Sequence, residues 1–166
     1  MTGIDVVPAL VAAAARHAAV ERLPVRFLAT ALDGLPKDEV FDIVLASGGV
    51  YEHTPTRARR IAFLLALADR LAPGGAVVLV AGWNRDRGVR HALVDGIRWS
   101  LGRALGDRFT TEPGDRLVRH LSLASDYRTT CFFHVFQTAE AITREIEAAG
   151  LAWRRHPEGA WIVTPR

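Results

Sequence analysis

Apolar residues recur along the chain with two spacings, which together predict alternating strands and helices. In the stretch 41–82, two apolar runs of strand length, Phe41–Ser47 and Val77–Val80, flank a segment with a helical stripe at Ile61, Leu64, Leu65, Ala68 and Leu71. Thr54-Pro55 predicts the start of that helix, and Pro73-Gly74-Gly75 predicts its end. Because two strands joined by a crossover helix pair in parallel, this stretch predicts a right-handed βαβ unit, in which both faces of the strand at 77–80 are covered.

The alternation continues on both sides of this unit. Before it we expect a strand ending at Asp5, an alanine-rich helix from about Pro8, and a strand at 25–29. After it we expect a helix at 89–105 and then a polar, irregular insertion at 109–126.

The carboxyl-terminal third predicts a helix followed by a hairpin. An aromatic run at 131–136 precedes a helix begun by Thr138 and ended by Gly150, and two short strands follow at 151–153 and 161–164. The fold class is therefore α/β, with a mostly parallel sheet and an antiparallel strand at the carboxyl end. The expected parallel strands end at Asp5, Ala29, Ser47 and Gly82.

Composition is that of one soluble globular domain spanning residues 1–166. The chain is 49% hydrophobic and 23% charged, and 21 Lys and Arg against 18 Asp and Glu give a net charge of +3, which we interpret as arginine usage rather than a nucleic-acid surface. No apolar run reaches the ~20 residues that span a bilayer, and the single Cys131 cannot form an internal disulfide, so a cytoplasmic location is expected. The six histidines lack metal-ligand spacing, so we expect no metal site.

Four motifs carry a resemblance to a known family. The segments "FDIVLASGGVYEH" and "LADRLAPGGAVVLV" resemble the fourth-strand and fifth-strand motifs of class I S-adenosylmethionine-dependent methyltransferases, over about forty residues. The "G-I-D-x-x-P" turn at 3–8 is similar to that family's second-strand motif. The terminal hairpin, which follows a helix ending in "E-A-A-G-L", is similar to the family's sixth and seventh strands. The resemblance implies a Rossmann-like three-layer sandwich and S-adenosylmethionine as the cofactor.

The resemblance also implies a set of cofactor-binding residues: Asp5, Val6, Leu32, Asp33, Ser47 and Gly48. Asp5 occupies the acidic position that accepts hydrogen bonds from both ribose hydroxyls, and the alternative is that it only caps the helix near Pro8. The family's adenine-edge acid corresponds to Ala31, so Asp33 could substitute, backbone groups around Leu32 could serve, or Asp33 could be a simple turn residue.

On the acceptor side, His53 is the candidate acid or base. It follows the fourth-strand motif, and an imidazole exchanges protons near neutral pH, which suits deprotonation of a hydroxyl or amine nucleophile. The alternative is a loop histidine that packs beside Tyr51. Tyr51, Trp83 and His134 are the expected substrate-binding residues, although His134 within an aromatic run also fits a core position.

The family's glycine-rich loop, "E/D-x-G-x-G-x-G", is not found in the sequence. We therefore expect an N-terminally truncated domain that lacks the family's first strand, the centre of its sheet. Without that first strand, the strands that end at Asp5 and Ser47 each have an unpaired edge. We expect these two edges to pair directly or to capture a strand from a second copy of the chain or from a partner chain.

The expected function is a methyltransferase domain that acts on a small-molecule or RNA acceptor and that is inactive as this chain, so its standing as an enzyme is uncertain. A short segment resembles one in tRNA wobble-uridine methyltransferases, and RNA is therefore retained as an expected class of acceptor. The alternative is a non-catalytic remnant or partial gene product that needs another chain to complete the sheet.

Overall fold

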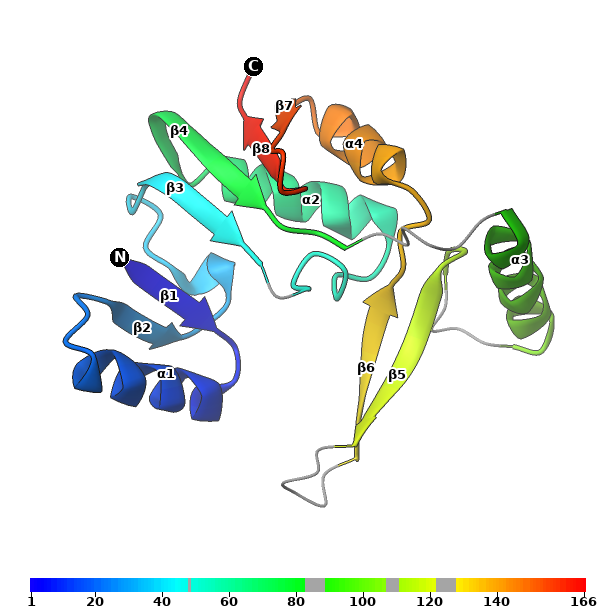
Figure 1. Cartoon of the computed structure of the whole chain (residues 1–166), viewed down its shortest axis with the longest axis horizontal. Helices are drawn as coiled ribbons and strands as arrows, with labels where there is room; N and C mark the ends of the chain where they lie inside the picture. Colours follow the sequence, from blue (N-terminus) through cyan, green and yellow to red (C-terminus); the bar gives the residue numbers. More distant parts are fainter. Residues whose placement is uncertain (48, 83–88, 107–110, 122–127) are drawn as a thin grey trace. The chain divides into compact units, whose positions relative to one another are not determined.

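The structure is a computed structural model that describes residues 1–47, 49–82, 89–106, 111–121 and 128–166 (Figure 1). It forms two compact units, Met1–Val40 and Phe41–Arg166. The first unit contains β1 (Thr2–Asp5), α1 (Pro8–Val20), β2 (Arg26–Ala29) and the 3-10 helix η1 (Leu32–Gly34). The second contains β3 (Phe41–Ala46), α2 (Arg57–Ala68), β4 (Leu71–Leu79), α3 (Val89–Ala104), β5 (Asp115–Leu121), β6 (Arg128–His134), α4 (Ala139–Ala148), β7 (Ala152–Arg155) and β8 (Trp161–Thr164).

In the first unit, β1 and β2 pair in parallel and α1 connects them. Pro8 stands in the first turn of α1, where a missing backbone N–H costs nothing, and the alanines that follow favour a helix. The register sets Asp5 opposite Ala29. The carboxyl ends of both strands therefore lie at one edge, with η1 shortly after β2.

The second unit contains a four-stranded sheet in the order β3-β4-β8-β7. β3 and β4 are parallel, whereas β8 runs antiparallel to both of its neighbours. The predicted βαβ unit and the antiparallel carboxyl-terminal hairpin are confirmed. β1 pairs with β2 in the first unit and β3 belongs to the sheet of the second, so the expected pairing of the strands that end at Asp5 and Ser47 stays a prediction.

One face of this sheet carries the core. Alternate residues of β4 and β8 are buried, and α2 and α4 pack against each other beside them. The core residues are Leu64, Leu67, Val77, Leu79, Ile142, Ile146, Trp161 and Val163. The prediction that the strand at 41–47 is buried is wrong for one of its faces, because Ile43 and Leu45 of β3 are 67% and 63% exposed. An apolar run shows which residues prefer burial, but it does not supply the element that buries them.

The segment predicted as an irregular insertion is partly a strand. β5 forms an antiparallel hairpin with β6, and Asp115 stands directly opposite His134 in the ladder. Figure 1 shows this hairpin as a separate two-stranded ribbon. The strand β5 was not predicted because polar residues interrupt its apolar run.

Two local details around α2 differ from the prediction. Thr56 caps the helix, since its side chain accepts a hydrogen bond from the Arg59 N–H, whereas the Thr54 hydroxyl bonds to the Val50 carbonyl. The Pro73-Gly74-Gly75 segment lies inside β4 at a register shift. A Cβ at Gly75 would lie 2.9 Å from the Asp42 carbonyl oxygen, so glycine permits this close approach of the strands.

Within the part of the chain that the structure describes, no helix has the length and apolar character needed to cross a membrane.

Candidate functional site

The loop that follows β3 is the centre of the candidate site. Residues 49–56 carry Tyr51, Glu52 and His53 and lead into α2. Two contacts attach the loop to the end of β6: the His134 N–H donates to the Glu52 carbonyl oxygen at 2.8 Å, and the His53 ring bonds to the Phe132 carbonyl. Thr56, at the end of the loop, has a φ of +64°, a strained value for a residue other than glycine.

The orientation of the His53 ring fixes which nitrogen can act as a base. Its Nδ1 lies 2.5 Å from the Phe132 carbonyl oxygen. A carbonyl only accepts, so Nδ1 carries the hydrogen, and Nε2 of the neutral ring keeps a lone pair that has no partner among the described residues. The ring also meets the Phe133 ring edge to face, with centroids 5.3 Å apart. His53 is exposed, so Nε2 is held in a defined position and can be reached by a small molecule.

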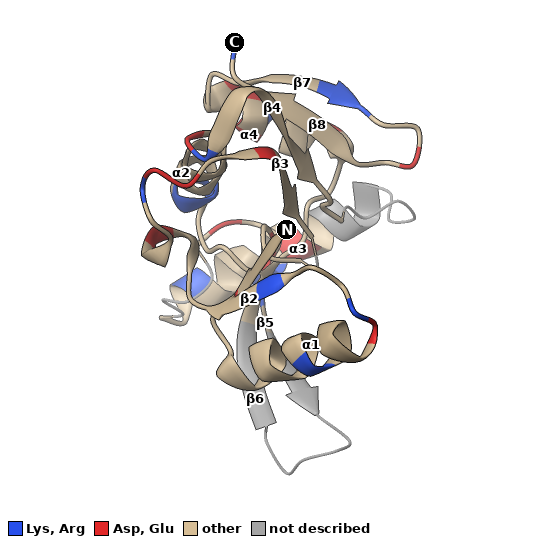
Figure 2. Ribbon diagram, turned by 90° about the vertical axis from the view of Figure 1, so that its left-hand side faces the viewer, with Lys and Arg blue, Asp and Glu red and all other residues tan. Residues whose placement is uncertain are grey.

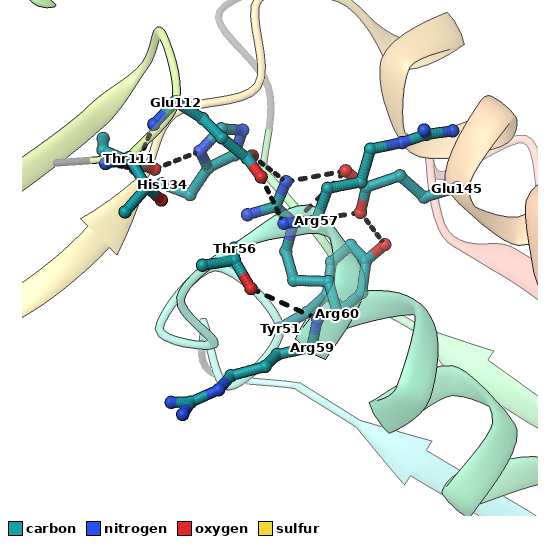
Figure 3. A network of polar contacts seen from close by, with 10 residues as sticks. Tyr51, Thr56, Arg57, Arg59, Arg60, Thr111, Glu112, His134 and Glu145 are labelled. Carbon is teal, nitrogen blue, oxygen red and sulfur yellow. Dashed lines mark hydrogen bonds and ion pairs between the residues drawn. The ribbon is translucent and has the colours of Figure 1, made fainter.

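A buried ionic network contacts the loop through Tyr51 and holds it in place (Figure 3). The Arg60 guanidinium, 1% exposed, bonds to both oxygens of Glu145 and, at 2.7 Å, to Glu112. The Tyr51 hydroxyl donates to Glu145 at 2.5 Å, and the Tyr51 ring stacks on Phe136. Burial, with Glu145 nearby, raises the pKa of Tyr51 above its usual range, so the hydroxyl stays protonated.

A second polar group lies at the base of the β5–β6 hairpin. The Asp115 carboxylate accepts hydrogen bonds from His134 Nδ1 at 2.7 Å and from the backbone N–H groups of Thr111 and Glu112. Glu112, Asp115 and His134 are close enough together to hold a metal ion. The carboxylate oxygens of Glu112 and Asp115 and the Nδ1 of His134 already take part in protein hydrogen bonds, however, and the Arg60 cation contacts Glu112. The group is therefore a hydrogen-bonded support of the site.

Acidification should weaken this support through Asp115. Burial opposes ionisation of Asp115, but the bonds from His134 and the two backbone N–H groups outweigh it and lower the pKa of Asp115 below its usual value near 4. The stabilisation is present above that value and is lost as the pH falls through the lower pKa of the folded state. Urea unfolding at several pH values should show this loss below about pH 4.

The matched variants for this measurement are Asp115→Asn and Asp69→Asn. The first should flatten the acid-side slope of unfolding free energy against pH, while the second, an exposed carboxyl at the end of α2, should leave it unchanged. An unchanged slope in Asp115→Asn would contradict the assignment.

Two of the three predicted substrate-binding residues, Tyr51 and His134, are buried, and the third, Trp83, is not among the described residues. Tyr51 is fully buried and offers no surface to a substrate, and His134 is 6% exposed and paired with Asp115. Trp83 lies outside the described residues, as does Gly48 of the predicted cofactor set. Ser47 is exposed directly after β3.

The remaining predicted cofactor residues lie in the first unit: Asp5, Val6, Leu32 and Asp33. Asp5 ends β1 and is exposed, and Leu32 and Asp33 form η1, after the neighbouring end of β2. Asp5 Oδ1 accepts the Val7 N–H at 2.8 Å, whereas α1 has no side-chain cap at its N-terminus. Asp5 therefore fixes the turn and does not cap the helix, and its Oδ2 has no partner in the described parts of the chain.

Sequence reasoning missed Glu52, which stands between two residues that it singled out. Glu52 is 3% exposed, and its Oε1 accepts the Gly82 N–H just beyond β4. It thus ties the loop after β3 to the end of β4, and its Oε2 is buried without a partner in the described residues. A glutamate between Tyr51 and His53 in a loop gave no periodic signal by which burial could be predicted.

Comparisons with known proteins agree with this architecture. Residues 1–75 match the family model for a methyltransferase domain. Among solved structures, the chain is similar to a sugar N-methyltransferase from Streptoalloteichus (16% identity, TM-score 0.62, covering 99% of this chain and 70% of that one). It is also similar to DhpI in a complex with SAM and HEP (25% identity, TM-score 0.63, covering 99% of this chain and 67% of that one). A SAM-dependent methyltransferase from Methanosarcina mazei is similar as well (15% identity, TM-score 0.66, covering 98% of this chain and 79% of that one). A search of the curated proteins gave no match.

The matched segment contains β1 to β3, α2 and the start of β4, which hold Asp5 and the loop with His53. The structural neighbours extend the likeness through the carboxyl-terminal hairpin. The resemblance drawn from the motifs is confirmed: this chain has the fold of the class I S-adenosylmethionine-dependent methyltransferases, and its first 75 residues match the methyltransferase-domain family.

Proposed function

We propose that the protein is a methyltransferase domain that uses S-adenosylmethionine and acts on a small-molecule nucleophile. The observation that carries the proposal is the His53 ring, whose Nδ1–H is held by the Phe132 carbonyl and whose Nε2 is left as an acceptor beyond the carboxyl end of a parallel strand. Open α/β sheets bind their ligands at this end.

The residues of the first unit fit the nucleoside half of the cofactor. The Asp5 carboxylate is fixed by the Val7 N–H through one oxygen and is exposed, so its other oxygen can accept hydroxyl hydrogens of a ribose. The cofactor would supply an electrophilic methyl group. Because the glycine-rich loop is not among these 166 residues, we expect weak cofactor binding and no turnover from this chain alone.

His53 would act as the base. Nε2 would accept the proton from the attacking hydroxyl or amine, and the tether from Nδ1 to Phe132 would keep the ring in the required tautomer. Glu52 would act as a positioning residue, because it binds Gly82 and the end of β6 while its neighbour His53 faces solvent.

Charge distribution favours a small molecule over RNA. Within the second unit, Figure 2 shows basic residues on more than one element, among them α2 and β7, with acidic residues interspersed. A nucleic-acid surface requires basic groups concentrated on one face. The printed descriptions of two structural neighbours, a sugar N-methyltransferase and an amino pentose methyltransferase, also support a small acceptor.

The tautomer of His53 gives a prediction that does not depend on turnover. Two-bond nitrogen–proton NMR of the neutral His53 ring should show the hydrogen on Nδ1 and none on Nε2. His53→Asn can keep the bond to the Phe132 carbonyl, whereas His53→Gln places its amide at the Nε2 side and breaks it. The amide resonance of Phe133 should therefore move less in Asn than in Gln, and a protonated Nε2 in the parent protein would exclude the proposed base.

The direct test of the proposal is calorimetric titration of the protein with S-adenosylhomocysteine. Saturable binding that weakens when Asp5 is replaced would support it. Absence of any binding would favour the non-catalytic alternative.

A further inference from the structure

A polar cluster on α3 and the β5–β6 hairpin takes no part in the site described so far. Its centre is Asp95, which is 8% exposed on α3. Both Asp95 oxygens lie 3.0 Å from Arg116 Nη2, and Oδ2 accepts Gln137 Nε2 at 2.9 Å. Trp99 follows Asp95 by one helical turn, so both lie on the same side of α3. These four residues, the Asp95 cluster, come from α3, β5 and the segment after β6.

The cluster is incomplete in its hydrogen bonding. Trp99 Nε1, Arg116 Nε and Gln137 Oε1 are buried and have no hydrogen-bond partner among the described residues. Buried polar atoms in native proteins are almost always bonded to protein, water or ligand. An ordered water molecule or a polar group of a ligand would satisfy these three atoms.

The donor or acceptor character of the three unpartnered atoms indicates which class of ligand could bind them. Two of the atoms are donors, Trp99 Nε1 and Arg116 Nε, and one is an acceptor, Gln137 Oε1. The Asp95–Arg116 ion pair has no net charge, so a charged ligand would gain no partner of opposite sign. An anion would offer only acceptors and an ammonium only donors, whereas a hydroxyl group both donates and accepts. The Trp99 ring adds an apolar surface, which suits the carbon face of a sugar.

The cluster lies on the same face of the hairpin as the base. Arg116 is directly opposite Phe133 in the β5–β6 ladder, and side chains of directly opposed residues share a face. The Phe133 ring contacts the His53 ring. Arg116 therefore links the cluster, through Phe133, to the side of the hairpin that His53 occupies.

We propose that the Asp95 cluster binds a neutral, hydroxyl-bearing small molecule of the sugar class. Its role as the acceptor subsite beside His53 rests on the proposed methyltransferase function, whereas the binding itself does not.

The experiment follows the indole N–H resonance of Trp99 by proton–nitrogen NMR, with the resonance assigned by loss in Trp99→Phe. D-glucose should move this resonance saturably, and neither sodium sulfate nor methylammonium chloride at equal ionic strength should do so. Arg116→Lys keeps the charge beside Asp95 but removes Nε, and it should weaken glucose binding about tenfold, the loss expected for one buried hydrogen bond.

Trp153→Phe is the matched control, because the Trp153 indole already donates to Glu147, and it should leave glucose binding intact. An unmoved Trp99 resonance, or movement by sulfate or methylammonium in place of glucose, would overturn the proposal. If Arg116→Lys does not fold, the comparison of the three probes on the parent chain decides alone. Glucose binding without S-adenosylhomocysteine binding would keep the site and reject the methyltransferase function, and the reverse result would reject only the site.

Discussion

Replacement of Arg60 by methionine is expected to lower the free energy of unfolding by about 3–5 kcal/mol, the cost of breaking a buried ion pair from one side. Arg60 is 1% exposed and faces the buried Glu145 and the part-exposed Glu112. Methionine fills a similar volume, so the loss would come from the carboxylates left without their cation. Chemical denaturation followed by circular dichroism measures it.

Two variants separate the ion pair from general damage. Arg59→Met changes an exposed neighbour on the same helix and should alter the free energy of unfolding by less than about 0.5 kcal/mol. Arg60→Met combined with Glu145→Leu removes both buried charges and should recover part of the loss, because no uncompensated charge remains at that pair. A loss below about 1 kcal/mol in Arg60→Met would mean that the pair is open to water, contrary to the structure.

The same network explains why the burial or exposure of the predicted site residues could not be read from the sequence. Tyr51 and His53 are two positions apart in one loop, yet Tyr51 is fully buried and His53 exposed. Nothing in the local sequence separates them, because the difference is created by Glu145 and Phe136, more than eighty residues later. Long-range partners decide burial in loops, which lack the periodicity that helps in helices and strands.

Regular elements were predictable where the apolar pattern and the end signals agreed. The α4 cap is an example: the Thr138 side chain accepts the Ala141 N–H as expected, and Gly150 ends the segment with φ +72°. β5 was missed because Asp115, Arg116 and Arg119 interrupt its apolar pattern. Its strand structure comes from pairing with β6, and its polar residues supply Asp115 and Arg116 to the two polar clusters.

Replacement of Asp5 by alanine is expected to weaken binding of S-adenosylhomocysteine roughly tenfold or more, because charge-assisted hydrogen bonds to ribose hydroxyls contribute ~1.5–3 kcal/mol each. The expectation follows from the position of Asp5 at the end of β1, beside the end of β2, in the segment that matches the methyltransferase family. Isothermal titration calorimetry with parent and variant proteins measures the ratio of dissociation constants.

Asp5 also holds the Val7 N–H, so the loss of that turn must be distinguished from the loss of ribose contacts. Asp5→Asn separates them, because an amide oxygen can still accept the Val7 N–H while the negative charge is gone. If the carboxylate binds the ribose, Asn should weaken binding nearly as much as Ala while keeping the melting temperature of the parent. Asp38→Ala, an exposed acid in the same unit, controls for the change in net charge. Equal affinity in the parent, Asn and Ala proteins would leave Asp5 as a turn residue, and the cofactor would then have to be held by groups other than the acid at the end of β1.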